Sequence, residues 1–231
     1  MGAAAGSALV AKPIRTMYQR HPSKQLNDLF SERPYQGADP IRAKFLFVGL
    51  DANYEANIAS MGIMPFVIEY HSDGQAFWLR HGVHHPFLLP AYPKRAGGGF
   101  YHRTFARIGF TQAHADQVSF VELLDVPTVG TSRLEIADLK SDHLNWLDDV
   151  IRNGAAKFVF IPPAPALLMR RSGHFRWLPS KHRRIGDHAL GVWAVRPGKT
   201  IYWHYHFSTY GKSFALKSRQ LAEIGEFLSG C

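Results

Sequence analysis

The chain has 231 residues, 46% of them hydrophobic, which is enough to cover both faces of a sheet in one domain and cramped for two. It carries 27 lysines and arginines against 18 aspartates and glutamates, a formal net charge of +9 with neutral histidine. Its one cysteine, Cys231, excludes a disulfide framework, a thiolate zinc site and a cysteine-held iron–sulfur cluster.

The sequence also predicts a compartment and a class of partner. Residues 1–6 lack the basic segment and long apolar core of a secretory signal, and no run approaches the roughly 18 apolar residues of a membrane span. We therefore expect a cytoplasmic protein in a reducing compartment, with no membrane partner. The basic excess favours nucleic acid or another polyanion, because neutralising phosphates releases counterions. Charge that serves solubility alone is the alternative.

Short apolar runs alternate with helix-length stretches along the chain. We expect residues 1–12 to form a disordered tail and residues 13–231 a single domain. Four runs bounded by turn residues predict buried strands at 45–50, 118–124, 157–161 and 200–205. Helical spacing of apolar residues predicts helices at 101–108, 138–151 and 218–228, and an extra strand is expected at 190–195. Right-handed crossovers then give an α/β fold, a three-layer α/β/α sandwich with a central, mainly parallel four-stranded sheet.

Polar residues follow the ends of the predicted strands. Asp51 comes after the first strand, Asp125 after the second, and His206 and Ser208 after the fourth. Each alone has an ordinary structural explanation, such as a turn cap or a structural histidine. Because ligands of open α/β sheets bind beyond the carboxyl ends of the strands, their shared position indicates a functional site.

The residues of these segments and their order along the chain resemble the uracil-DNA glycosylase superfamily over residues 44–212. Familiar members carry Gly-Gln-Asp-Pro-Tyr after the first strand, Leu-Leu-Asn after the second and His-Pro-Ser-Pro-Leu after the last. The corresponding segments of this chain are Gly49-Leu50-Asp51-Ala52-Asn53-Tyr54, Leu123-Leu124-Asp125 and His206-Phe207-Ser208-Thr209-Tyr210. The resemblance, to a divergent member without an iron–sulfur cluster, implies a monofunctional glycosylase that flips uracil out of DNA, hydrolyses its N-glycosidic bond and leaves an abasic site.

The resemblance also implies roles for single residues. Asp51 would orient the attacking water and stabilise the sugar cation, while His206 would donate a hydrogen bond to O2 of the departing uracil. The expected base-binding residues are Asp125, Asn53, Tyr54 and Phe66. The expected DNA contacts are Ser208, Thr209, Tyr210, Lys212, Pro163, Lys94 and Arg95.

This chain departs from the family pattern at the base-binding positions. Asp125 stands where the family uses Asn, and a carboxylate accepts hydrogen bonds but donates none unless it is protonated. We therefore hypothesise a tolerant pocket that also accepts hypoxanthine and xanthine. In the family a Tyr directly after the Pro excludes the methyl group of thymine. Here Asn53 is inserted and Tyr54 falls one position later, so the resemblance does not imply that thymine is excluded. Phe66 lies near the spacing of the family's stacking aromatic, although Tyr54 is an alternative platform and Phe66 could equally belong to the core.

We assign no metal and no cofactor. His81, His84 and His85 imitate ligand spacing but have no acidic or cysteine partner nearby, and residues 93–99 lack the ending of a nucleotide-binding P-loop. We expect a monomer that binds DNA. The alternative function is a catalytically silent nucleic-acid-binding protein with the same fold; an unrelated α/β hydrolase is disfavoured because the chain has no Gly-x-Ser-x-Gly nucleophile elbow.

Overall fold

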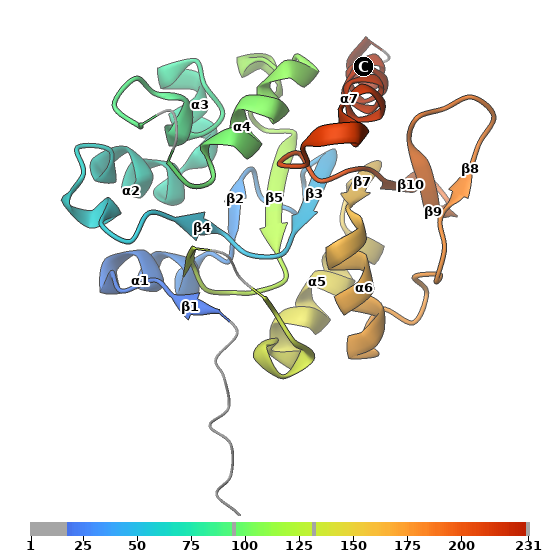
Figure 1. The fold of residues 1–231 in the computed structure, drawn as a ribbon, viewed down its shortest axis with the longest axis horizontal. Helices are drawn as coiled ribbons and strands as arrows, with labels where there is room; N and C mark the ends of the chain where they lie inside the picture. Colours follow the sequence, from blue (N-terminus) through green and yellow to red (C-terminus); the bar gives the residue numbers. More distant parts are fainter. Residues whose placement is uncertain (1–17, 94–95, 131–132, 230–231) are drawn as a thin grey trace, which may run out of the picture.

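The structure is a computed structural model that describes residues 18–93, 96–130 and 133–229, so the tail predicted at residues 1–12 lies outside the described residues. Figure 1 shows an α/β fold, in which helices surround a sheet that crosses the molecule. The predicted α/β class is confirmed. In sheet order the strands are β2 (Tyr35–Gly37), β5 (Val118–Glu122), β3 (Phe45–Gly49), β7 (Phe158–Ile161), β10 (Lys199–Trp203), β9 (Gly191–Arg196) and β8 (Arg183–Arg184).

Among the described residues this sheet is mixed and has seven strands, in place of the mainly parallel four-stranded sheet that was predicted. The four predicted strands are β5, β3, β7 and β10, which pair in parallel with one another in that order. The other pairings, β2 with β5, β9 with β10 and β8 with β9, are antiparallel. The turn between β9 and β10 reverses the chain within two residues, and its Gly198 has φ of 70°. Such a tight connection can only join antiparallel strands.

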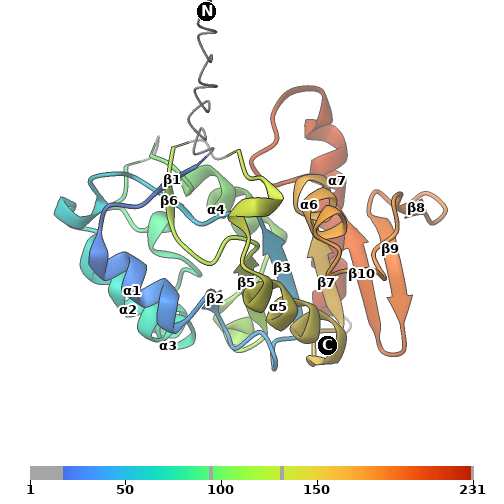
Figure 2. The same ribbon diagram turned by 90° about the horizontal axis from the view of Figure 1, so that it is seen from below.

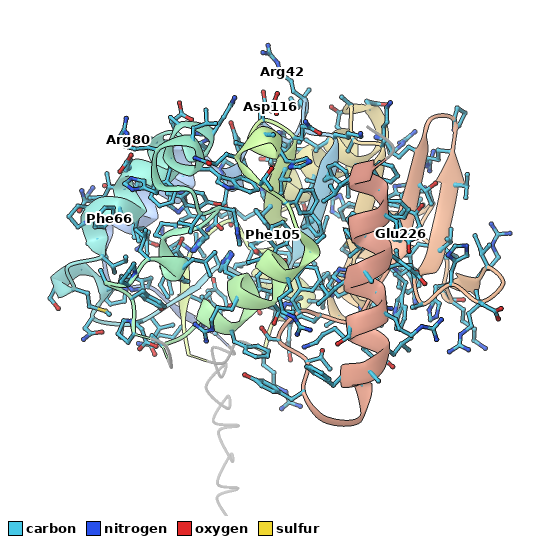
Figure 3. The ribbon with its side chains drawn as sticks, turned by 90° about the horizontal axis from the view of Figure 1, so that it is seen from above. Arg42, Phe66, Arg80, Phe105, Asp116 and Glu226 are labelled. Carbon is cyan, nitrogen blue, oxygen red and sulfur yellow. The ribbon has the colours of Figure 1, made fainter. Side chains whose placement is uncertain are left out.

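Helices cover both faces of this sheet. Figure 2 shows α5 (Ser141–Asn153) and α6 (Pro163–Ser172) together on one face of the sheet. Their apolar side chains pack with those of the strands, such as Leu46 and Val159. On the other face, α4 (Gly99–Phe105) and α7 (Phe214–Ser229) cover a cluster rich in phenylalanine, and Figure 3 views the molecule from that side. Alternate residues of a strand point to opposite faces, which is why each central strand contributes to both clusters.

A third group of helices flanks the β2 edge of the sheet. It comprises α1 (Lys24–Glu32), α2 (Met64–Ser72) and α3 (Gly74–His81). Apolar residues of α1 and α2 form a separate cluster around Tyr54. Short 3-10 helices occur at Ile58–Ser60, Pro86–Leu88, Ala106–Ile108, Gln112–His114, Ile136–Asp138 and Gly211–Ser213. No helix in the described part of the chain combines the length and the low polarity needed to cross a membrane.

A second, smaller sheet lies where the central strands end. It consists of β1 (Gln19–Arg20), β6 (Thr128–Val129) and β4 (Asn53–Tyr54). Strand β4 follows β3 and β6 follows β5, and the two pair in parallel, with Asn53 opposite Thr128. The small sheet therefore ties together the two segments that leave neighbouring strands of the large sheet.

Candidate functional site

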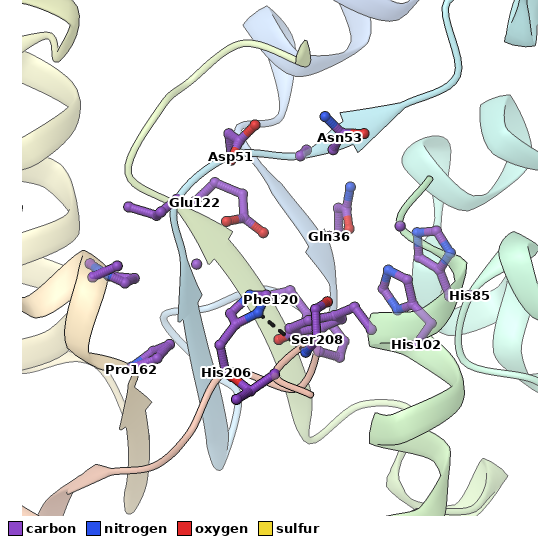
Figure 4. A pocket seen from close by; sticks show the side chains of 18 of the residues that line it. Gln36, Asp51, Asn53, His85, His102, Phe120, Glu122, Pro162, His206 and Ser208 are labelled. Carbon is purple, nitrogen blue, oxygen red and sulfur yellow. Dashed lines mark hydrogen bonds between the residues drawn. The ribbon is translucent and has the colours of Figure 1, made fainter. Parts of the chain in front are cut away.

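A pocket of about 640 Å³ lies beyond the carboxyl ends of the central parallel strands. Its walls come from the end of β3 and from the segments that follow β3, β7 and β10, at residues 49–54, 162–165, 205–206 and 208–209. Residues of β2, β5 and α4 also line it. Figure 4 shows Asp51 and Glu122 on one side of this space, His85 and His102 on another, and His206 facing them. The structure thus brings the predicted Asp51 and His206 to one cavity, as the strand-end argument expected.

The small sheet holds Asp51. The hydroxyl of Thr128 donates a hydrogen bond to Oδ2 of Asp51, and the backbone N–H of Thr128 donates to the carbonyl oxygen of Ala52 at 2.9 Å. The amide of Asn53 donates to the carbonyl oxygen of Gly130. Asn53 and Asp51 both line the pocket, but the Asn53 amide nitrogen is engaged with the protein itself.

His206 lies in the loop after β10. The backbone N–H of Ser208 donates to Nδ1 of His206 at 3.2 Å, the interaction dashed in Figure 4. Because Nδ1 accepts this bond, a neutral ring carries its proton on Nε2. Burial lowers the pKa of His206 to about 4, against the opposing influence of Asp51. At neutral pH His206 is therefore an uncharged hydrogen-bond donor at the wall of the pocket.

A buried lysine anchors the His206 loop. Lys217 of α7 is 1% exposed, and its ammonium group donates to the carbonyl oxygens of Phe207 at 3.1 Å and Thr209 at 2.6 Å. Burial lowers the pKa of Lys217. This role of Lys217 was not predictable from the sequence, because a lysine in an amphipathic helix gives no sign that its charge faces a loop carbonyl.

The carboxyl group in the pocket beside Asp51 is Glu122, not the predicted Asp125. Asp125 does not line the pocket, and its Oδ2 forms an ion pair with Nζ of Lys140 at 2.6 Å. The prediction was wrong about the strand's end: β5 stops at Glu122, two residues before the predicted limit. Phe120 and Glu122 share the face of β5 that reaches the pocket, and an acidic residue inside an apolar run was the sequence signal for this.

Burial, together with the nearby Asp51, raises the pKa of Glu122 to about 8. The carboxyl lies directly over Gly49, the residue opposite it on β3, and a Cβ at position 49 would overlap Oε2 of Glu122. Glycine at the end of β3 is therefore what gives the carboxyl room. At pH 7 Glu122 is mainly the neutral acid, which offers one donor and one acceptor.

Tyr54 and Gln36 form a second polar wall. Nε2 of Gln36 donates to the hydroxyl of Tyr54 at 2.9 Å, and that hydroxyl lies 3.0 Å from Nε2 of His71. Burial lowers the pKa of His71 to about 3, so its ring is neutral at pH 7 and carries one proton on its two nitrogens. Tyr54 is only 2% exposed. It belongs to the apolar cluster of α1 and α2 and also lines the pocket.

Of the three histidines with ligand-like spacing in the sequence, His85 lines the pocket, together with His102. The rings of His85 and His102 stack with centroids 3.5 Å apart and line the pocket, while Nε2 of His84 lies 3.1 Å from Nδ1 of His102. Burial lowers the pKa of all three. His81 is elsewhere, paired with Glu69 at 3.0 Å. Over the ranges that the structure describes, no three histidine, cysteine or acidic side chains form a candidate metal site.

The predicted DNA contacts fall into two groups. Ser208, Thr209 and Pro163 line the pocket, and Tyr210 lies beyond its mouth, 69% exposed, with its ring stacked on Phe100 at a centroid distance of 4.4 Å. Lys94 and Arg95 lie outside the described residues, and so does the side chain of Lys212.

Phe66 does not line the pocket. It lies on α2, its ring edge-on to His81 with centroids 5.4 Å apart, and Figure 3 labels it at the periphery of the molecule. The aromatic rings that do face the cavity include Phe120, Phe87 and Tyr101. The predicted spacing from Asp51 failed because the chain turns through the small sheet and a 3-10 helix before α2 begins.

Comparison of the chain with protein-family models and with curated proteins gives no match. The chemistry of the site is therefore what indicates a function. That chemistry is specific: a carboxylate, a neutral histidine donor and a second, mainly protonated carboxyl line one partly apolar cavity.

Proposed function

We propose that the protein is a monofunctional DNA glycosylase. It flips uracil, or another deaminated base such as hypoxanthine or xanthine, out of DNA, hydrolyses the N-glycosidic bond and leaves an abasic site. The observation that carries the proposal is that Asp51 and His206 line one pocket beyond the strand ends. The three layers and the four central parallel strands support a uracil-DNA glycosylase-like fold.

Asp51 acts on the sugar. Breaking the bond between C1′ and the base nitrogen leaves a sugar with oxocarbenium character and a base that carries negative charge. The Asp51 carboxylate stabilises the positive sugar and accepts a proton from the water whose oxygen bonds to C1′. The hydrogen bond from Thr128 fixes one carboxylate oxygen, so the carboxylate is held in place before DNA binds.

His206 acts on the base. Its Nε2–H donates to a carbonyl oxygen of the departing base as negative charge builds there. The Ser208 N–H fixes the tautomer that this role requires, and the lowered pKa keeps the ring neutral at physiological pH. The bonding electrons leave with the base, which is released as an anion or takes up a proton from water.

Residues at the mouth of the pocket bind the DNA in this proposal. Ser208, Thr209 and Pro163 are placed to contact the backbone of the flipped nucleotide, and the exposed ring of Tyr210 can fill the gap that the base leaves. The basic residues Lys94, Arg95 and Lys212 add phosphate contacts in this proposal. The protein works as a cytoplasmic monomer, and neither a metal nor a cofactor takes part in the proposed reaction.

The test is base release from single- and double-stranded oligonucleotides that contain uracil, hypoxanthine, xanthine or a T:G mismatch. Strand breakage after alkali reports each abasic site. We expect release of uracil, with losses of about 100-fold or more in Asp51→Asn and His206→Ala. The surface variant Asp28→Asn is the matched control. Intact DNA binding without release of any base would favour the catalytically silent binder.

A further inference from the structure

Gln36, Phe120 and Glu122 lie on one face of the large sheet. Gln36 of β2 is directly opposite Phe120 of β5, and side chains of directly opposed residues point to the same side. Glu122 is two residues further along β5 and therefore also points to this side. All three line the pocket, and Figure 4 shows Gln36 and Glu122 extending toward the space over Phe120.

The Gln36 amide is held in one orientation by the protein. Its Nε2 donates to the Tyr54 hydroxyl at 2.9 Å, and that hydroxyl also lies 3.0 Å from Nε2 of His71. With the side chain 7% exposed and its nitrogen engaged, Gln36 presents Oε1 to the pocket as a fixed acceptor.

The Glu122 carboxyl occupies the space over Gly49 that a side chain at position 49 would fill. Burial and the nearby Asp51 both disfavour its ionised form. As a neutral acid it supplies an O–H donor to the same pocket that the Gln36 acceptor lines. The other titratable groups that line the pocket are Asp51, Tyr54, His85, Tyr101, His102, Tyr205 and His206.

We propose that Gln36 and Glu122 read the edge of the flipped base, with Gln36 accepting from a ring N–H and Glu122 donating to the adjacent carbonyl oxygen. The ligand class is any base with N–H beside C=O, which includes N3–H and O4 of uracil and N1–H and O6 of hypoxanthine. Cytosine and adenine present an unprotonated ring nitrogen beside an amine, so the fixed Gln36 oxygen faces a lone pair and rejects them. This inference rests on the proposed glycosylase function.

The role of Glu122 makes release dependent on pH. The neutral acid, which is the active form, is present below the raised pKa of about 8 and is lost as pH rises through it. The ionised carboxylate repels the base carbonyl. His206 stays neutral throughout this range because burial holds its pKa at about 4, and Asp51 is one of the causes of the Glu122 shift.

The experiment compares single-turnover release of uracil and hypoxanthine by the wild type, Glu122→Gln, Glu122→Ala and Gln36→Leu, between about pH 6 and pH 9.5. The carboxamide of Glu122→Gln keeps a donor and an acceptor but cannot ionise. We expect wild-type release to fall about tenfold per pH unit above the Glu122 pKa. Glu122→Gln should retain about a tenth or more of the rate at pH 7 and lose this decline. Glu122→Ala and Gln36→Leu should lose roughly 10- to 100-fold at pH 7.

Thermal unfolding of each variant separates these losses from a loss of fold, and Glu122→Gln, which changes little in shape, keeps the test valid if Glu122→Ala unfolds. If Glu122→Gln and Glu122→Ala were equally inactive at every pH, the inference would be overturned. Glu122 would then act as an ionised carboxylate or by transferring its proton. Wild-type rates in Glu122→Ala and Gln36→Leu would also overturn it. A wild type that releases no base defeats the proposed function itself, whereas release with a discordant variant pattern defeats only this inference.

Discussion

The ammonium group of Lys217 lies 2.6 Å from the carbonyl oxygen of Thr209, three residues after His206. The lysine is 1% exposed and also binds the Phe207 carbonyl, so one charged group on α7 fixes the loop that carries the histidine. The loop has little regular structure of its own, and α7 supplies the rigidity that a positioned donor requires.

Lys217→Met should reduce base release by about tenfold or more while leaving DNA binding close to the wild-type level, since the loop carbonyls lose their donor and His206 loses its fixed position. The buried Phe207 carbonyl oxygen and the partly buried Thr209 carbonyl oxygen lose their donor, and leaving the buried one unpaired costs about 1 to 3 kcal/mol in the free energy of unfolding. Single-turnover rates and urea unfolding measure the two effects. The exposed Lys24→Met is the control, and unchanged release in folded Lys217→Met would contradict the positioning role.

Gly49→Ala should displace the Glu122 carboxyl, because the new methyl group occupies its place. We expect release to fall about tenfold or more, and Gly62→Ala, which meets no atom within 4 Å, to behave as the wild type. The loss from Gly49→Ala should shrink when Glu122→Ala is already present, because both changes act on the same carboxyl. Independent, additive losses would show that Gly49 serves the fold alone.

Asp125→Asn should leave the ratio of uracil to hypoxanthine release unchanged, since the Asp125 carboxylate pairs with Lys140 outside the pocket. The lost pair is largely at the surface and should cost no more than about 1 kcal/mol of stability. Release rates on both substrates check this directly. A large shift in the ratio would return Asp125 to the role that the sequence motif implied.

Tyr210→Ala should lower release from double-stranded DNA about tenfold or more and affect single-stranded DNA much less, because only a duplex leaves a gap to fill when a base flips out. The 60%-exposed Val195 on β9 provides the control Val195→Ala. Equal losses on both substrates would mean that Tyr210 contacts the strand without acting as a wedge.

The free energy of unfolding should fall as the pH drops from about 6.5 toward 4. Burial lowers the pKa of His71, His84 and His204 to about 3 and of His206 to about 4. Unfolded histidines take up protons near pH 6.5, whereas these folded ones stay neutral, so acid favours the unfolded chain. Each should contribute on the order of 1 to 2 kcal/mol of destabilisation between about pH 7 and 5. Urea unfolding at several pH values measures this, and His188→Gln, at an exposed position, should keep the wild-type slope.

The central strands and the main covering helices were predictable because their apolar patterns are long and continuous. The helix predicted at 138–151 is α5 (Ser141–Asn153), and the one predicted at 218–228 lies within α7. Each buries a stripe of side chains whose spacing is visible in the sequence. Asp51 and His206 followed from the same reasoning, since a strand's end places the next residue at the sheet's edge.

The rest of the site depends on pairings between distant segments. Strand β2 has three residues and β4 has two, too few to show a periodic pattern, and Gln36 and Asn53 lie on them. Glu122 was missed because a strand's last residue cannot be fixed to within two positions from its sequence. The buried Lys217 and the stacked His85 and His102 are defined only by the elements that close over them.

The central claim is that Asp51 and His206 cooperate in cutting an N-glycosidic bond. The most direct measurement is single-turnover release of uracil from a labelled oligonucleotide by the wild type and by Asp51→Asn, with DNA binding measured on the same samples. We predict rapid release by the wild type and a loss of about 100-fold or more in Asp51→Asn at unchanged binding. Equal release by both proteins, or none by the wild type on any deaminated base, would contradict the account.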